Sequence, residues 1–189
     1  KAVHAGDRKR PPEQVPVTTP IYTASSYSTE RMEQLDRIFA REEPGYCYSR
    51  YDNPSNAALE ELVATLEGGH GALACASGMS AIQVAVLAAI LDRRKSVVAA
   101  HALYGATVSL LTKVFEPLGI SLRFVDICDL PAVEAAITAA KPGCVLMETI
   151  SNPLLRIGQL DCIAALSRAA GAALVVDNTF ATPMLVRPM

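Results

Sequence analysis

Apolar and polar residues alternate from residue 54 onward in blocks that fit helices and strands in turn. Residues 54–67 carry apolar side chains at helical spacing, and two glycines follow them. The later blocks predict strands over 72–75, 96–100, 121–125, 144–147 and 173–177, and helices over 79–91, 104–118, 130–140 and 160–170. Short strands that are apolar throughout and alternate with helices indicate a parallel sheet covered on both faces. We therefore expect an α/β fold with three layers, α/β/α, around a mainly parallel sheet.

The predicted helix over 79–91 differs from the others because it is apolar almost all round. Only Ser80 and Gln83 interrupt the apolar residues. A helix without a polar face is typical of the interior of a protein. We expect this helix to be buried.

The first fifty residues have a different pattern, rich in Pro, Ser and Thr and with little periodicity. One short helix is predicted over 30–39. A segment of this kind cannot bury a core of its own, so it must lie on its own domain or on a neighbouring subunit. The sequence thus predicts an N-terminal arm over 1–53 and a large domain over 54–189.

Charge and hydropathy narrow the possible functions. Lys and Arg number 17 against 19 Asp and Glu, which gives a net charge of −2 and excludes the basic surface typical of nucleic-acid binding. The chain is 51% hydrophobic and 19% charged, which excludes disorder. The longest aliphatic run, 84–91, is far shorter than the roughly 20 residues of a membrane helix. Charges in the first twenty residues argue against a signal peptide. We expect a soluble cytoplasmic protein that binds neither membranes nor nucleic acid.

Five cysteines are spread through the chain without a Cys-x-x-Cys pair, and only three His accompany them. This pattern predicts no metal site and no disulfide framework. Three of the cysteines lie in apolar stretches. We expect these to be small buried side chains in a reducing compartment.

Polar residues cluster directly after the predicted strands. Ligands of parallel α/β sheets bind at the carboxyl ends of the strands, so these positions are candidates for chemistry. They are Ser77–Met79, His101–Tyr104, Asp126, Glu148–Asn152 and Asp177–Thr179.

The turn at Ser77, Gly78 and Met79 opens the apolar helix. Free backbone N–H groups at a helix N-terminus bind anions, and Gly78 lets a phosphate approach the main chain. The alternative is that Ser77 only caps the helix. The turn by itself does not decide between the two.

Two further candidates have structural alternatives of their own. Asp177 ends the most apolar strand and needs a partner to stay ionised, which a protonated ring nitrogen, a metal or the N–H groups of the next helix could provide. Tyr104 could lay its ring over a planar cofactor, or it could be an ordinary half-buried tyrosine. For Asp177 by itself, capping of the next helix is the favoured interpretation over a contact with a cofactor. For Tyr104, nothing local decides between the two alternatives.

The arm contains the segment Tyr46-Cys-Tyr48-Ser-Arg50-Tyr51. A guanidinium group and phenols in an extended segment suit the binding of a phosphate. The alternative is a surface arginine without a ligand.

Several short motifs follow one another along the chain: Val3–Gly6, Pro20–Tyr22, Tyr48–Arg50 with Asn53-Pro54, Leu66–Gly68, Ala76–Met79 with Ala81-Ile82, Leu103–Gly105, Glu148-Thr149 with Ser151–Pro153, and Val175–Thr179. In their order and spacing they resemble the Cys/Met-metabolism family of pyridoxal-phosphate enzymes. The family includes cystathionine γ-synthase, cystathionine γ-lyase, O-acetylhomoserine sulfhydrylase and methionine γ-lyase. The resemblance implies the large domain of a fold-type I enzyme with pyridoxal 5'-phosphate as cofactor.

The resemblance also implies how the cofactor phosphate is held. Gly78 and Met79 would bind it through their backbone N–H groups. Tyr48 and Arg50 would reach the phosphate of a neighbouring subunit's cofactor, which implies a homo-oligomer and, from the family, a dimer of dimers.

The remaining implied contacts concern the cofactor ring. Tyr104 would stack on the ring and could move protons in catalysis, and Asn152 would approach the 3-hydroxyl oxygen. Asp177 would keep the ring nitrogen protonated, so that the cofactor acts as an electron sink. Thr179 would support Asp177.

The resemblance further predicts parts beyond this chain. We expect the lysine that anchors the cofactor, in a Ser-x-Thr-Lys-like motif, to follow Met189, together with a C-terminal domain that binds the carboxylate of a small amino-acid substrate. Ala106 stands where methionine γ-lyases typically carry Cys, which disfavours that activity. A cystathionine γ-synthase or γ-lyase is favoured, O-acetylhomoserine sulfhydrylase comes next, and a non-catalytic α/β ligand-binding module is the alternative of another class.

Overall fold

The computed structural model describes residues 16–189. The Val3–Gly6 motif and the start of the predicted arm lie outside these residues. The chain divides into two compact units between Leu62 and Val63, and each unit is described by itself.

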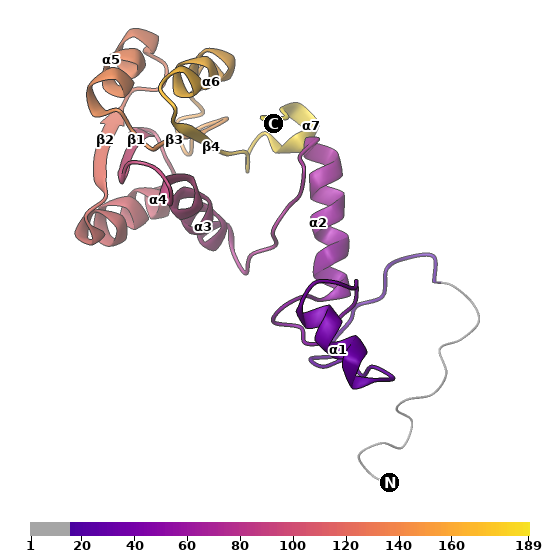
Figure 1. The fold of residues 1–189 in the computed structure, drawn as a ribbon. Coiled ribbons are helices and arrows are strands. Elements are labelled where there is room, and N and C mark those ends of the chain that lie inside the picture. Colours follow the sequence, from indigo (N-terminus) through magenta and orange to yellow (C-terminus); the bar gives the residue numbers. More distant parts are fainter. Residues whose placement is uncertain (1–15) are drawn as a thin grey trace. The chain divides into compact units, whose positions relative to one another are not determined.

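The C-terminal unit contains a four-stranded parallel sheet (Figure 1). Its strands are β1 (Ser96–Ala100), β2 (Ser121–Val125), β3 (Cys144–Glu148) and β4 (Ala173–Asp177). Their order is β2-β1-β3-β4, with every neighbouring pair parallel. Because all four strands run the same way, their carboxyl ends share one edge of the sheet.

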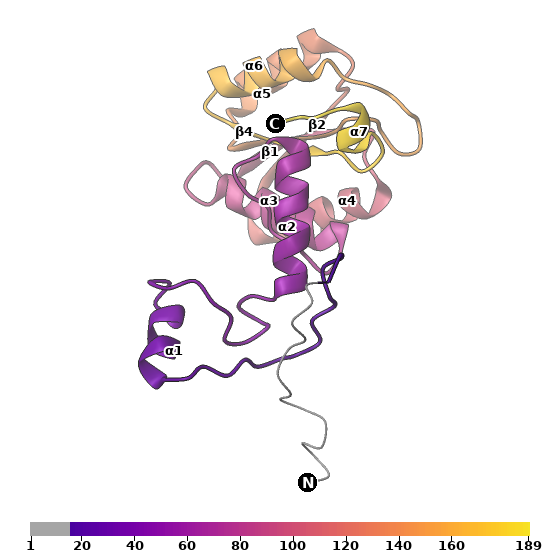
Figure 2. The same ribbon diagram turned by 90° about the vertical axis from the view of Figure 1, so that its right-hand side faces the viewer.

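Helices cover both faces of this sheet. Helices α3 (Gly78–Ile90) and α4 (Gly105–Leu110) lie on one face, and α5 (Leu130–Ala140) and α6 (Leu160–Ala169) lie on the other (Figure 2). The short helix α7 (Thr182–Leu185) follows β4. The predicted three-layer α/β/α fold with a parallel sheet is confirmed.

The core lies around the two central strands. Every residue of β3 is buried, and so is every residue of β1 except Ser96, whereas β4 at the edge is only half-buried throughout. Side chains of Val86 from α3 and of Val133 and Ile163 from the opposite helices complete this core. Burial of such aliphatic side chains stabilises a fold by about 1.5–3 kcal/mol each.

The predicted helix over 104–118 has three parts in the structure. After α4, residues Leu111–Phe115 form a π-helical turn and Glu116–Leu118 a 3-10 turn. Gly119 then ends the helix with a φ of 81°. The predicted end is therefore confirmed, although only the first part is α-helical.

The N-terminal unit holds the short helix α1 (Met32–Phe39) and the start of α2 (Pro54–Glu67). Between them, the Asn53 side chain donates hydrogen bonds to the carbonyl oxygen of Tyr22 at 3.2 Å and to Ser49 Oγ at 3.0 Å. Its own oxygen accepts the amide of Ser55 at 2.9 Å, at the first turn of α2. One buried amide thus joins distant parts of the predicted arm. Both predicted helices are confirmed.

Two expectations about the apolar runs are wrong. Residues 72–75 form no strand in the structure, and an apolar run of four residues is a weak signal that does not distinguish a strand from other structure. Helix α3 is not buried all round, since Val84 and Leu87 are exposed in this chain, as is Leu91 at its C-cap. Only the face of α3 toward the sheet is covered.

The expectation for the cysteines is wrong for most of them. Only Cys144, in the central strand β3, is buried, while Cys128 and Cys162 are exposed and Cys47 and Cys75 lie between these extremes. Cys162 sits on the solvent side of α6, which an apolar sequence stretch does not reveal.

Two features are absent from residues 16–189. No helix there has the length and apolar character needed to cross a bilayer. Within the same residues, His, Cys, Asp and Glu side chains nowhere gather in threes around a potential metal position.

Candidate active site

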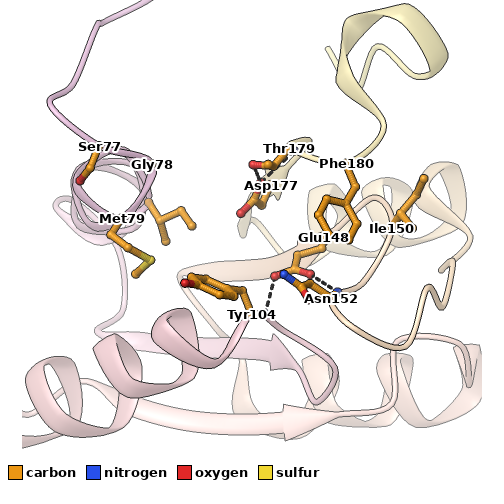
Figure 3. A pocket seen from close by; sticks show the side chains of 11 residues that line it. Ser77, Gly78, Met79, Tyr104, Glu148, Ile150, Asn152, Asp177, Thr179 and Phe180 are labelled. Atoms are coloured by element: carbon orange, nitrogen blue, oxygen red, sulfur yellow. Dashed lines mark hydrogen bonds between the residues drawn. The ribbon is translucent and has the colours of Figure 1, made fainter.

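Most of the polar residues that follow the strands gather around one cavity of about 300 Å³ at the carboxyl edge of the sheet (Figure 3), whereas His101 and Asp126 do not line it. Its lining residues come from α3, from the loops after β1 and β3, and from the turn after β4. They include six predicted cofactor-binding residues, Gly78, Met79, Tyr104, Asn152, Asp177 and Thr179. The apolar side chains of Ile82, Ile150 and Phe180 complete the wall. The structure therefore brings these six residues together.

The N-terminus of α3 opens into this cavity. Ser77 caps the helix by accepting the amide of Ser80 at 3.2 Å, so the capping interpretation is correct. The cap does not engage the amides of Gly78 and Met79, and helix geometry provides no intrahelical acceptor for them. A Cβ added at Gly78 would meet no atom within 4 Å, so space is open beside the main chain. Ser77 can cap the helix while Gly78 and Met79 remain available for an anion.

Asp177 ends β4 and points into the cavity (Figure 3). Its Oδ1 accepts hydrogen bonds from the amide of Thr179 at 3.0 Å and from the hydroxyl of Thr179 at 2.5 Å. The next helix, α7, begins only at Thr182, and its N-cap is Ala181. The favoured capping interpretation is therefore wrong, because Asp177 is held by a turn and does not cap a helix.

Tyr104 stands between β1 and α4, as its N-cap residue, and 48% of it is exposed. Its ring lies along the cavity, with the hydroxyl turned toward the α3 side (Figure 3). An aromatic ring in this position can stack on a planar ligand. An exposure of 48% fits both this role and the half-buried alternative.

Glu148 is a site residue whose role the sequence did not reveal. It ends β3, is 5% exposed and lines the cavity. Its Oε1 accepts the amide of Tyr104 at 2.6 Å, and its Oε2 accepts the amide of Asn152 at 2.8 Å. Burial raises the pKa of Glu148, the two amides lower it, and nearby Asp177 raises it, with a net rise. A carboxylate at the end of a wholly apolar strand was the available signal, as it was for Asp177.

Tyr48 and Arg50 belong to the N-terminal unit. The guanidinium carbon of Arg50 lies 5.2 Å from the ring centre of Tyr48 and 5.7 Å from that of Tyr51. The two tyrosine rings meet edge to face at 6.3 Å. Arg50 is therefore ordered by cation–π contacts within its own unit. Its predicted contact with a phosphate stays a prediction.

Comparison with known proteins identifies the family. The model of the Cys/Met metabolism PLP-dependent enzymes matches residues 1–189. The chain belongs to this family. Family members use pyridoxal 5'-phosphate as cofactor and act on sulfur amino acids.

Relatives within the family carry different names. O-succinylhomoserine sulfhydrylase of Pseudomonas aeruginosa is 38% identical over 100% of this chain and 46% of its own length. Cystathionine gamma-lyase of Bacillus subtilis is 38% identical over 92% of this chain and 43% of its own length. The chain thus spans less than half of the length of these relatives.

A solved structure agrees with the fold. A Campylobacter jejuni protein crystallised with N'-pyridoxyl-lysine-5'-monophosphate superimposes with a TM-score of 0.80 at 30% identity. The match covers 92% of this chain and 42% of that one. The predicted resemblance to a fold-type I large domain is confirmed.

Proposed function

We propose that this chain forms the N-terminal arm, residues 1–53, and most of the cofactor domain, residues 54–189, of an enzyme that makes or breaks C–S bonds. The proposed reaction is γ-elimination or γ-replacement on a small sulfur amino acid, of the cystathionine γ-synthase or γ-lyase type. The observation that carries this proposal is the cavity of Figure 3, where helix amides, an aromatic ring and a carboxylate converge. These are the groups that a phosphorylated pyridine cofactor requires.

The cavity fits such a cofactor at both ends. The amides of Gly78 and Met79 would bind the phosphate, aided by the positive end of the α3 dipole. Asp177, which lines the same cavity from the end of β4, would bind the ring nitrogen. A volume of about 300 Å³ lies at the lower end of the range of small-molecule sites.

The cofactor, when bound, supplies an electron sink for negative charge at the substrate Cα. Asp177 would hold a proton on the ring nitrogen, and Thr179 keeps its carboxylate in place through two hydrogen bonds. Tyr104 would cover one face of the ring and exclude water from it. Its hydroxyl would move a proton to or from the substrate. Asn152 would contact the 3-hydroxyl oxygen.

Two parts of the active enzyme are proposed to lie outside these residues. The lysine that anchors the cofactor would follow Met189, and an arginine of a C-terminal domain would bind the substrate carboxylate. The N-terminal unit would extend to a second subunit, where Tyr48 and Arg50 bind its phosphate. The enzyme would be a homo-oligomer, a dimer of dimers, in the cytoplasm.

The second candidate is a homoserine-ester sulfhydrylase. The relative from P. aeruginosa carries such an activity in its name and matches the whole chain. Ala106, at the second position of α4, does not separate it from the cystathionine enzymes. Both are compatible with the same cavity.

The test uses the full-length protein loaded with pyridoxal 5'-phosphate. We expect it to cleave cystathionine or to form it from cysteine and an activated homoserine. Formation of homocysteine that depends on sulfide, without cystathionine turnover, would favour the second candidate. A colourless protein that binds no pyridoxal phosphate but binds a nucleotide would overturn both, in favour of a ligand-binding module.

A further inference from the structure

Glu148 occupies a special position in the sheet. It is the last residue of β3, which lies between β1 and β4, and its side chain is 5% exposed. Each carboxylate oxygen accepts one main-chain amide, that of Tyr104 in the loop after β1 and that of Asn152 in the loop after β3 (Figure 3). One side chain thus joins two loops that are 48 residues apart, from 104 to 152 in the sequence.

Both loops carry residues of the proposed cofactor site. Tyr104 provides the ring of the cavity wall, and Asn152 provides an amide. Neither main-chain position is fixed by a ladder of the sheet, because both follow the ends of their strands. Glu148 therefore forms a direct link between these two main-chain positions, because its carboxylate accepts both amides.

We infer that Glu148 is a positioning residue, whose carboxylate bridges the amides of Tyr104 and Asn152 and so fixes the two groups against the cofactor ring. This inference rests on the proposed function. A carboxylate suits the role since it accepts with both oxygens, and hydrogen bonds to an ion are about twice as strong as those between neutral groups. Glutamine, of the same size, has only one acceptor oxygen.

The neighbouring strand gives the bridge a link to cofactor binding. Glu148 and Asp177 are register partners on β3 and β4, and both line the cavity. Two carboxylates side by side repel each other, which disfavours the ionised form of Glu148. A protonated ring nitrogen bound to Asp177 would relieve this repulsion. The bridge should therefore be stronger when the cofactor is bound.

The test compares four forms of the full-length protein: the wild type, Glu148→Gln, Glu148→Asp, and the control Glu134→Gln. Glu134 lies on α5, is exposed and is not among the residues that line the cavity. Amide hydrogen exchange without cofactor measures the bridge itself. Titration with pyridoxal 5'-phosphate, followed by visible absorbance and circular dichroism, measures its effect on the cofactor.

For Glu148→Gln we expect faster exchange in peptides that contain the amides of Tyr104 and Asn152. We also expect the affinity for the cofactor to fall about tenfold or more relative to the wild type. The visible circular dichroism of the bound cofactor should change, because the ring contacts shift. The control Glu134→Gln should match the wild type in amide exchange, cofactor affinity and circular dichroism. Glu148→Asp, which keeps the charge but is shorter, should fall between the wild type and Glu148→Gln.

The outcomes separate this inference from the proposed function. Wild type that binds the cofactor, with Glu148→Gln unchanged in affinity and dichroism, overturns the inference alone. Unchanged exchange at the two amides overturns it as well. Wild type that binds no pyridoxal 5'-phosphate overturns the proposed function, and the inference with it. Should Glu148→Gln be unstable, Glu148→Asp supplies the same comparisons.

Discussion

Thr179 donates two hydrogen bonds to the same carboxylate oxygen of Asp177, from its amide at 3.0 Å and from its hydroxyl at 2.5 Å. Both bonds go to Oδ1 and neither engages Oδ2, and Asp177 lines the cavity. The pair therefore orients the carboxylate by a turn of only three residues. In the proposed enzyme, this orientation aims one oxygen at the cofactor ring nitrogen.

The first prediction concerns this pair. Thr179→Val removes the hydroxyl bond and keeps the amide bond, and we expect about tenfold weaker binding of pyridoxal 5'-phosphate, as for other hydrogen bonds to a charged group. Thr179→Ser keeps the hydroxyl and should retain most of the affinity. Asp177→Asn removes the charge itself and should lower kcat/KM by about two orders of magnitude or more. Equal affinity of Thr179→Val and wild type would count against the assigned role.

The second prediction concerns the cysteines. Cys144 in β3 is fully buried, and burial raises the pKa of its thiol to about 12. Because the thiolate is the reactive form, we expect Cys144 to resist alkylation at pH 8, whereas the exposed Cys128 reacts readily. Mass spectrometry of the alkylated native protein checks this, with denatured protein as the control. Alkylation of native Cys144 at the rate of Cys128 would show that β3 is not in the core.

The layers of the fold could be predicted from the sequence because each central strand is an uninterrupted apolar run. The predicted strand ends also place Tyr104, Asn152 and Asp177 at one edge of the sheet, because parallel strands end on the same side. Which side of α3 stays uncovered could not be predicted, since Val84 and Leu87 are as apolar as the buried Val86. Exposure there depends on what packs on the helix.

The role of Glu148 was out of reach for a related reason. Its contact with Asn152 spans four residues, but its contact with Tyr104 spans 44 and depends on β1 and β3 lying side by side. The pattern of apolar and polar residues does not reveal which strands are neighbours in the sheet. The sequence indicates that Glu148 follows an apolar strand, and only the fold shows which two amides it accepts.

The third prediction concerns stability in acid. Asp126, after β2, accepts the amide of Cys128 and the guanidinium of Arg156, and these two contacts, the amide first, hold its pKa below the usual range. A lowered pKa means that the ionised form stabilises the fold. This contribution is present above the ordinary pKa of an aspartate and is lost as the pH falls through the lowered value.

We therefore expect Asp126→Asn to lower the thermal midpoint at neutral pH and to make no difference in strong acid. Arg156→Gln should have the smaller effect, because it leaves the amide contact of Cys128 in place. Thermal unfolding of the three proteins from pH 2 to pH 7 measures this. A difference between wild type and Asp126→Asn that grows as the pH falls would contradict the assignment.

The fourth prediction concerns the predicted reach of Arg50 into a neighbouring subunit. Arg50→Ala should weaken cofactor binding and lose its cation–π contacts with Tyr48 and Tyr51.

If Arg50 serves the neighbour's site, Arg50→Ala and Asp177→Asn damage sites that belong to different subunits. Unfolding and refolding the two inactive variants together then creates mixed dimers in which one site has both residues intact. For a two-fold dimer mixed at random, about a quarter of the wild-type activity should return. In the control mixture Lys141→Gln, at the exposed end of α5, replaces Arg50→Ala, and because its own sites stay intact this mixture measures how much activity survives unfolding and refolding. No recovery in the mixture of Arg50→Ala with Asp177→Asn, despite proven exchange, would place Arg50 at the site of its own subunit.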